Sequence, residues 1–294
     1  MRRATGVLWL SIVGLLAVLL LVWAHPVGRD SSVLNRGWNG LSLASSELGA
    51  SVLVAYDDLG EVPQPATLVL IPRLPLDDSD LAALDAFVRS GGTLVVLDDF
   101  GFGNDVLSHL AVDIRFHGGT LMDPLYCYRH ASMPRVAFTR SDPAQQPGVL
   151  VLNHATWLEV GTGVDVWALS SYFSYGDVDS DGSRTGGDPD GPLPVGATAT
   201  RGAGMVVAVS DASLLLNSMA VLGDNVDAVA RYARFEVLFD QVHLPEAEMD
   251  RSKNALDAVR EVLGGGGGTV VLVLLICCLA VGYAWYNRGR RENE

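Results

Sequence analysis

The sequence predicts an α/β domain with an open, mostly parallel sheet and a β-rich insertion, held between one membrane-spanning helix at each end. Three short apolar runs are typical of strands buried on both faces of a sheet, namely residues 67–71, 93–99 and 205–211. Residues 75–92, between the first two runs, have the spacing of an amphipathic helix and complete a β-α-β unit. The segments 6–24 and 269–286 contain no charged residue, and each is long enough to cross a bilayer.

The two apolar segments predict a two-pass topology in the cell membrane. At a rise of 1.5 Å per residue, each spans roughly 27–29 Å as a helix, which matches the hydrocarbon core of a bilayer. Arginines lie just outside both segments, in residues 1–5 and 287–294. The positive-inside rule therefore assigns both tails to the cytoplasm and the intervening domain, residues 51–244, to the outer side.

A cleaved signal peptide is the competing interpretation of residues 6–24, and the arginines before this segment fit either one. However, the apolar stretch is longer than the apolar core of most signal peptides. The residues at its end, 23–26, also make a poor small-x-small cleavage site. An uncleaved anchor is therefore favoured.

The first part of the domain contains the clearest elements. Residues 25–50 are mostly polar and predict a linker with a first short helix, followed by a strand at 51–56. In the β-α-β unit, Asp77 or Asp78 can cap the helix, and the two glycines at 91–92 can end it. The apolar positions recur at helical spacing: Leu81, Leu84, Phe87 and Val88.

The middle of the domain is less regular. A short helix at 105–110 and a strand at 112–116 continue the alternation. Residues 117–204 then predict the β-rich insertion, in which Pro, Gly and Asp at 174–196 indicate a loop. Strands are expected within the insertion at 135–139, 148–153 and 164–171.

After the insertion the chain returns to the α/β pattern. Helices are expected at 212–219 and near 224–239, behind the buried strand at 205–211. Residues 245–263 predict a charged amphipathic helix, and five glycines at 264–268 form a flexible joint before the second anchor.

Composition excludes some functions. The chain carries a net charge of −14, and because arginines sit at both ends, the middle is more acidic than the whole. Such a surface repels phosphate backbones, so nucleic acid is not expected as a partner. Of the three cysteines, Cys277 and Cys278 lie in the second apolar segment, and Cys127 is alone in the domain. An intradomain disulfide and a cysteine zinc site are therefore excluded.

One loop has the ligand spacing of a calcium site. Residues 177–188 place Gly182 at the sixth position, where a sharp turn is needed, and Asp188 at the twelfth. Alternate side chains of such a loop converge on one point and offer the oxygen ligands that Ca²⁺ prefers. The sequence predicts a structural Ca²⁺ here, with a solvated acidic turn as the alternative. The candidate ligand residues are Asp177, Asp179, Asp181, Ser183 and Asp188.

A second candidate site lies at the carboxyl edge of the predicted sheet. Asp98 and Asp99 end one buried strand, and Ser210 and Asp211 end another. Open α/β sheets bind ligands at this edge, so these residues are candidates for ligand binding. The alternative is that they cap the following helices or bond to their own loops.

The sequence gives little support for nucleophilic catalysis. Cys127 has His130 three residues later, but no glycine-flanked nucleophile elbow surrounds a cysteine or serine. The histidines also lack the spacing of a helical metal site. A hydrolase that uses Cys127 or an acidic pair is therefore the third hypothesis.

Several segments together resemble an uncharacterised archaeal and bacterial family of membrane-anchored proteins: RGWNGLS, FVRSGGTLVVLDDFG, DVDSDGSRTGGDPDGPLPV and MVVAVSDASLLLNSM. This family has a domain of unknown function related to class I glutamine amidotransferases, which are flavodoxin-like, and to the auxiliary component of gliding-motility ABC transporters. The resemblance implies a three-layer α/β sandwich and gene neighbours that encode MoxR-type ATPases. It implies no activity, because Asp98 and Asp99 run into Phe100 where the amidotransferase nucleophile is expected.

The sequence therefore favours a non-enzymatic, membrane-tethered accessory protein. It would interact with other envelope or membrane proteins in an envelope assembly, with a link to a MoxR-type ATPase system implied by the resemblance. The alternative is a ligand-binding sensor or transporter accessory subunit that uses the carboxyl edge of the sheet.

Overall fold

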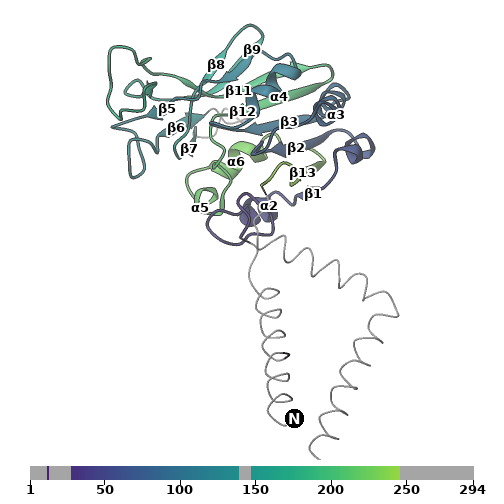
Figure 1. Ribbon diagram of the computed structural model, residues 1–294. Helices are drawn as coiled ribbons and strands as arrows, with labels where there is room; N and C mark the ends of the chain where they lie inside the picture. Colours follow the sequence, from purple (N-terminus) through teal and green to yellow (C-terminus); the bar gives the residue numbers. More distant parts are fainter. Residues whose placement is uncertain (1–11, 13–27, 139–146, 246–294) are drawn as a thin grey trace, which may run out of the picture. The chain divides into compact units, whose positions relative to one another are not determined.

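One mixed sheet organises the part of the chain that the computed structural model describes, which is residue 12 and residues 28–138 and 147–245 (Figure 1). Nine strands build it. From one edge to the other these are β1 (Ser51–Leu53), β13 (Glu236–Asp240), β2 (Ala66–Leu70), β3 (Thr93–Leu97), β12 (Gly204–Val209), β11 (Pro194–Arg201), β9 (Val164–Leu169), β6 (Arg135–Phe138) and β7 (Gly148–Val151).

The half of the sheet from β1 to β12 is parallel, and we name it the parallel half. All residues of β2 and β3 are buried, as their continuous apolar runs predict. Helix α3 (Asp78–Arg89) connects β2 to β3, and the side chain of Asp77 caps it by accepting hydrogen bonds from the backbone N–H groups of Ser79 and Asp80, both at 2.9 Å. The β-α-β prediction is confirmed, including all four apolar positions that the helix buries.

The half from β11 to β7 is antiparallel, and we name it the antiparallel half. The β-rich insertion is therefore an extension of the main sheet, and the sheet is mixed with a parallel core instead of mostly parallel. The strands predicted near 135–139, 148–153 and 164–171 are confirmed. Strand β11 begins inside the predicted loop, because its small residues, GATAT, provide no apolar run.

The predicted helix near 224–239 is wrong over its second half. Helix α6 (Asn225–Ala230) ends early, and the chain then forms β13 between β1 and β2. A short apolar run does not distinguish a buried strand from a buried helix, and here pairing with two neighbours decides for the strand. The helix expected at 212–219 is reduced to α5 (Asn217–Ala220).

Two small sheets complete the described strands. Strand β4 (Ile114–Phe116) pairs with β8 (Leu158–Val160), and β5 (Thr120–Met122) pairs with β10 (Tyr175–Asp177). The predicted strand at 112–116 is confirmed as β4, although it lies outside the main sheet. The short helix expected at 105–110 is α4 (Gly103–His109).

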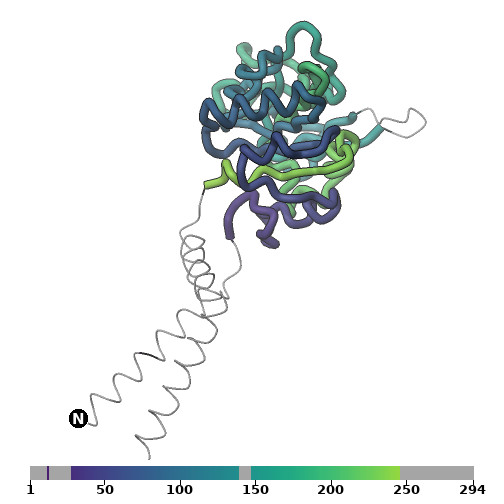
Figure 2. The backbone as a smooth tube through the Cα atoms, turned by 90° about the vertical axis from the view of Figure 1, so that its right-hand side faces the viewer, coloured from purple at the N-terminus to yellow at the C-terminus, as the bar shows by residue number. Residues whose placement is uncertain are grey.

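Helices cover both faces of the main sheet, which gives three layers. Apolar residues of α3, α4 and the 3₁₀ helix η1 (Tyr56–Glu61) pack on one face. Residues of α2 (Ser42–Glu47) and α6 belong to the core on the other face. In Figure 2 the yellow-green end of the domain runs among purple and blue segments, because β13 returns into the N-terminal part of the sheet.

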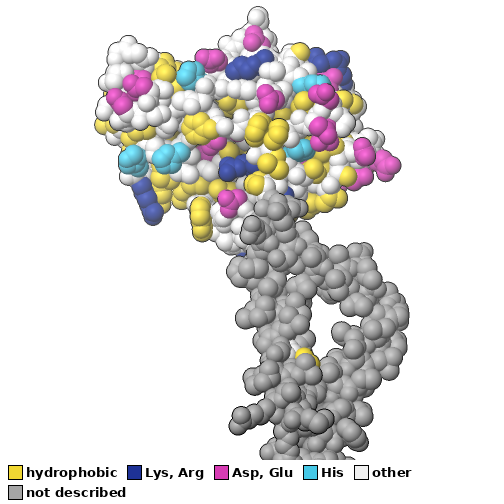
Figure 3. All heavy atoms as spheres, in the orientation of Figure 1, with side chains coloured by type: hydrophobic (Ala, Val, Ile, Leu, Met, Phe, Trp, Pro, Cys, Tyr) yellow, Lys and Arg dark blue, Asp and Glu magenta, His cyan; other side chains and the backbone are white. Residues whose placement is uncertain are grey.

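Several predictions lie outside the described residues. These are the two anchors at 6–24 and 269–286, the terminal tails, and the helix and glycine joint at 246–268. Within the residues that the structure does describe, no helix is long and apolar enough to cross a membrane. Acidic side chains are spread over the face shown in Figure 3, consistent with the net charge of −14.

Candidate functional site

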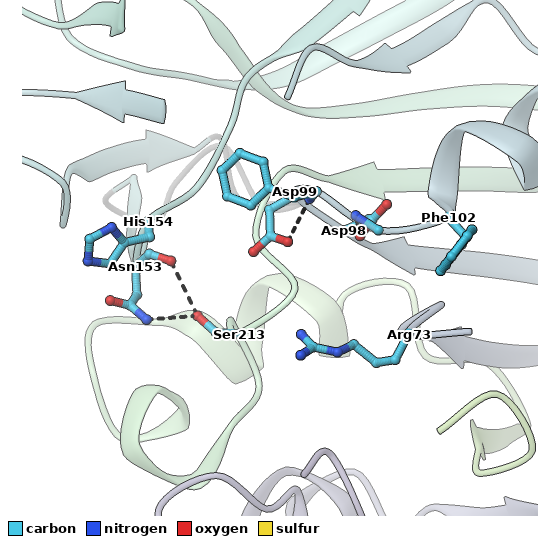
Figure 4. Close-up of a pocket in the computed structure, with 9 residues that line it drawn as sticks. Arg73, Asp98, Asp99, Phe102, Asn153, His154 and Ser213 are labelled. Atoms are coloured by element: carbon cyan, nitrogen blue, oxygen red, sulfur yellow. Dashed lines mark hydrogen bonds between the residues drawn. The ribbon is translucent and has the colours of Figure 1, made fainter. Parts of the chain in front are cut away.

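A cleft of about 460 Å³ opens at the carboxyl edge of the parallel half (Figure 4). Its walls come from four parts of the chain: the end of β2, the loop between β3 and α4, the segment that follows β7, and the segment that follows β12. Carboxyl edges of parallel strands are where open α/β sheets place their ligands. The lining residues are Arg73, Asp98, Asp99, Phe100, Gly101, Phe102, Asn153, His154 and Ser213.

Arg73 and Asp99 place opposite charges on the cleft. Burial raises the pKa of Asp99, and the charge of the exposed Arg73 acts in the opposite direction. The two groups influence each other electrostatically, but in the described part of the chain no ion pair or side-chain hydrogen bond holds the Arg73 guanidinium. In Figure 4 both side chains point into the same space. A charged ligand can therefore bind Arg73 without first breaking an internal ion pair.

Asn153 and His154 form another side of the cleft. His154 has a positive φ of 51°, which is uncommon for a residue other than glycine and marks a tightly determined turn. Its Nε2 lies 3.4 Å from Ser132 Oγ. The Asn153 side chain donates to Ser213 Oγ at 3.3 Å. The antiparallel half thus supplies polar groups to a cleft whose other walls come from the parallel half.

Asp98 has a structural role. Its two carboxylate oxygens accept hydrogen bonds from the backbone N–H groups of Gly101 (2.9 Å) and Gly103 (2.7 Å), and its side chain is buried. Burial raises the pKa of Asp98, and these hydrogen bonds oppose that increase. Asp98 thereby fixes the loop that positions Asp99. The contacts of Asp98 therefore fit the alternative interpretation, in which its carboxylate bonds to its own loop, better than direct ligand binding.

Ser210 and Asp211 lie behind the cleft and do not line it. Asp211 is fully buried and accepts hydrogen bonds from Asn153 N (2.8 Å), Ser213 N (2.7 Å) and Ser213 Oγ (2.7 Å). Burial raises its pKa to about 7. The buried Oγ of Ser210 has no hydrogen-bond partner among the described residues. Of the four predicted ligand-binding residues, Asp98 and Asp99 line the cleft, where the Asp98 carboxylate is already bonded to its own loop, and Asp211 supports its neighbours.

Seven lining residues were not among the sequence-based candidates, and four of them carry polar side chains: Arg73, Asn153, His154 and Ser213. Arg73 follows the predicted strand at 67–71, so it could have been predicted as a residue at the carboxyl edge of the sheet. Ser213 lies two residues beyond Asp211 and belongs to the same edge. Asn153 and His154 gave no such signal, because they reach the cleft only through the pairing of the antiparallel half with the parallel half.

The acidic loop provides a second candidate site, away from the cleft in sequence. One oxygen each of Asp177, Asp179 and Asp188 lie within 4.8 Å of one another, an arrangement that can hold a metal ion. The carboxylate of Asp181, another predicted ligand, is not in this group, and neither Asp181 nor Ser183 donates a backbone hydrogen bond to Asp188. Instead, the backbone N–H of Asp181 donates to Asp177 Oδ1 (3.2 Å), and that of Ser183 donates to Asp181 Oδ1 (2.7 Å).

Backbone hydrogen bonds hold the two ends of this loop together. Asp188 accepts from the N–H groups of Thr185 (2.7 Å) and Val178 (3.1 Å), and these bonds lower its pKa. Asp177 is buried and also accepts from Gly182 N at 2.9 Å. The lowered pKa of Asp188 favours its ionised form, which suits a hard cation.

Cys127 and His130 are not arranged as a nucleophile and its base. His130 Nδ1 hydrogen-bonds to Ser132 Oγ at 2.9 Å. Within the described residues no hydrogen bond joins His130 to Cys127, which is a half-buried free thiol.

Comparison with known families gives one match that spans most of the chain. The model of a domain of unknown function, DUF4350, matches residues 34–233. The chain belongs to the DUF4350 family. The match covers both halves of the sheet and the cleft, apart from β13. A comparison with curated proteins gives no match.

Solved structures similar to this DUF4350 protein share little sequence with it. The mmIFT52 N-terminal domain is 14% identical, with 60% of this chain and 77% of that chain covered and a TM-score of 0.47. The cytoplasmic protein STM1381 from Salmonella typhimurium LT2 is 15% identical, with 65% of this chain and 83% of that chain covered and a TM-score of 0.40. A β-galactosidase from Bacillus circulans sp. alkalophilus is 15% identical, with 56% of this chain and 22% of that chain covered and a TM-score of 0.33. The fold itself is an α/β domain with a mixed sheet and a parallel core.

Proposed function

We propose that this protein is a non-enzymatic, membrane-tethered accessory protein whose outer α/β domain binds a small polar ligand in the carboxyl-edge cleft. The observation that carries the proposal is that Arg73 and Asp99 both line the cleft and bear opposite charges but form no ion pair with each other. Isolated opposite charges at a concave site favour a ligand that satisfies both. The ligand class is a small molecule with an anionic group for Arg73 and hydrogen-bond donors for Asp99.

The arrangement of the cleft supports binding more than catalysis. Arginine binds carboxylate or phosphate with a planar fork of donors and is always charged, so it is suited to recognition. The Ser213 hydroxyl donates to Asp211, whose pKa is raised, and no histidine is hydrogen-bonded to it among the described residues. In the described part of the chain Ser213 lacks the histidine that acts as general base in a Ser-His-Asp triad. A ligand-binding accessory subunit is therefore favoured over a hydrolase.

We further propose that the Asp177–Asp179–Asp188 group binds a structural Ca²⁺. A loop rich in Asp and Gly has little apolar surface to hold it in place, and a cation shared by three carboxylates would order it. The Asp181 carboxylate accepts a hydrogen bond from Ser183 N, so Asp181 would join the coordination only if the loop rearranged; the Ser183 hydroxyl remains a candidate ligand.

The two anchors and the partners are also part of the proposal. The uncharged segments at 6–24 and 269–286 support a position in the cell membrane with the domain on the outer side. The family resemblance supports a place in an envelope assembly with a MoxR-type ATPase system. Co-purification of the tagged full-length chain with this ATPase tests the partner, and recovery equal to that of an untagged control would contradict it.

A thermal-shift screen of the full-length protein tests the cleft. The compounds are small amino acids, dicarboxylates and inorganic phosphate, and we expect one class to raise the melting temperature. The increase should disappear in Arg73→Ala and in Asp99→Asn. It should remain in Arg129→Ala, a matched change of an exposed arginine outside the cleft. A flat response across the compounds, or an increase that survives Arg73→Ala, would contradict the proposed site.

A further inference from the structure

The segment at the start of the described domain exposes large apolar side chains. Leu34 and Trp38 are 72% and 73% exposed, and Leu43 is 46% exposed. Leu34 and Leu43 also line a shallow groove of about 640 Å³ together with Arg36. We name Leu34, Trp38 and Leu43 the N-terminal patch. Exposed tryptophan is costly in water, so a patch of this kind marks a surface that something covers.

Buried amides hold the N-terminal patch in a fixed shape. The Asn217 side chain donates to the carbonyls of Asn35 (3.1 Å) and Gly37 (2.6 Å), and it accepts from Leu43 N (2.9 Å). Asn35 in turn donates to Arg29 O at 2.9 Å. A Cβ at Gly40 would lie 1.8 Å from Asn35 O, so the turn requires glycine there. The RGWNGLS motif therefore builds a rigid turn that keeps Trp38 pointing outward.

The chain connects this turn closely to the first predicted anchor. The apolar segment ends at Ala24, and three residues, 25–27, separate it from the described domain. Three extended residues span at most about 10–11 Å. Ser31 N donates to Asn39 O at 2.9 Å, so the backbone beside Trp38 is bonded directly to the first described residues. If residues 6–24 span the membrane as predicted, this short connection is what brings the turn close to the bilayer surface.

The other end of the domain leaves from the same place. Arg29 Nε donates to Pro245 O at 3.1 Å, and the Gln241 side chain exchanges hydrogen bonds with Val33 N (3.0 Å) and Ser31 O (3.2 Å). On this side 23 residues, 246–268, separate the domain from the second apolar run, against three residues on the N-terminal side. The N-terminal connection is therefore the shorter of the two between the domain and a predicted anchor.

The chemistry of the patch fits the interfacial zone of a bilayer. Tryptophan prefers this zone, and arginine can bind lipid phosphate. Residues 28–50 contain two acidic side chains, Asp30 and Glu47, and two basic ones, Arg29 and Arg36. This segment is thus neutral in a chain of net charge −14, and it does not share the repulsion that the rest of the domain has for anionic lipid.

From these observations we propose that the N-terminal patch inserts Trp38 and Leu34 into the outer leaflet and sets the domain on the membrane in one orientation. The inference rests on the proposed membrane tether. It adds that the domain is docked, whereas a tether alone would leave it free to rotate.

The test is made with the full-length chain in liposomes of phosphatidylcholine and phosphatidylglycerol. Cys127, Cys277 and Cys278 are replaced by serine, Trp38→Cys is introduced, and the single thiol is labelled with an environment-sensitive NBD group. The matched control carries the label at Tyr172→Cys, a position that is 81% exposed in the loop after β9. We expect the label at 38 to be blue-shifted and quenched severalfold by lipids brominated in the acyl chain, and the label at 172 to be unaffected.

Two results would overturn the proposal. One is a label at 38 that is as accessible to aqueous iodide as the label at 172. The other is a blue shift without quenching by brominated lipid, which would mean that a second copy or another protein covers the patch. Extraction of the chain by alkaline carbonate is measured separately. Extraction would refute the tether itself, whereas retention combined with either result would refute only the docking.

Discussion

The two halves of the main sheet differ in how their strands are stabilised. In the parallel half, β2 and β3 bury every residue, so each strand is a continuous apolar run. In the antiparallel half, β6 alternates exposed with buried residues, β9 buries only Ala168 among its residues, and both depend on cross-strand pairing. The cleft lies where both contribute. The comparison teaches that the parallel half supplies the charged groups, Arg73 and Asp99, and the antiparallel half supplies the polar wall, Asn153 and His154.

The largest expected effect separates the cores of the two halves. Val95→Ala in β3 removes a fully buried side chain and should cost about 2–3 kcal/mol from lost burial and the resulting cavity. Val166→Ala in β9 is the matched change at a half-buried position and should cost less than about 1 kcal/mol. Urea unfolding followed by circular dichroism measures both. Equal losses would mean that the two halves are equally packed.

A smaller effect is expected at the loop that positions Asp99. In Gly103→Ala the new Cβ would lie 2.7 Å from Asp98 Oδ2 and 2.7 Å from the Phe116 ring, so we expect a loss of about 1–3 kcal/mol. Gly60→Ala is the control, because a Cβ there has no neighbour within 4 Å. Thermal unfolding compares the two. A stable Gly103→Ala protein would show that Asp98 does not hold the loop rigidly.

Calcium should stabilise the loop that the antiparallel half carries. At ten times its Kd, a cation bound only to the folded state contributes about 1.4 kcal/mol. For a domain of this size that raises Tm by about 3–6 °C. Asp179→Asn should abolish the increase, whereas Asp181→Asn should retain most of it, because Asp181 is outside the group of three carboxylates. If millimolar calcium leaves Tm of the native chain unchanged, the proposed ion site is wrong.

The smallest effect is a pH dependence from the end of β13. Burial alone lowers the pKa of His243, but hydrogen bonds and charges from Asp240 (3.3 Å) and Asp80 (3.1 Å) outweigh it and raise the pKa. Since the folded-state pKa exceeds the unfolded value, this contribution is complete below about pH 6.5 and is lost as pH rises through the folded-state pKa.

Melting temperatures between pH 5.5 and 8.5 measure this contribution. We expect His243→Gln to flatten the decline above pH 6.5, and the exposed His109→Gln to leave it unchanged. A decline of the same size in all three proteins would assign the pH dependence to other groups, among them Asp211, whose pKa is raised to about 7.

The sequence predicts the parallel half well for a physical reason. Complete burial demands apolar residues at every position of β2 and β3, and the Asp77 cap and the glycines at 91–92 mark the ends of α3. The sequence does not predict β11, because its small residues form no apolar run, or β13, because its short apolar run fits a helix equally well. Their partners lie far away in the chain and are fixed only by tertiary pairing.

The same distinction applies to the candidate site. Asp99 could be predicted, because it directly follows a recognised strand. The roles of Asp98 and Asp211 could not, because the difference between contacting a ligand and bonding to a loop depends on which backbone N–H groups lie nearby. His154 reaches the cleft from an insertion whose position in the sheet no local pattern specifies.

Isothermal titration of the compound that stabilises the protein most tests the central claim, that Arg73 and Asp99 bind a small polar ligand in the cleft. A charged hydrogen bond lost in Arg73→Ala corresponds to about 1.5–3 kcal/mol, so the affinity should fall roughly 10- to 100-fold. Arg129→Ala should bind with the native affinity. Equal affinities for the native protein and Arg73→Ala would contradict the account.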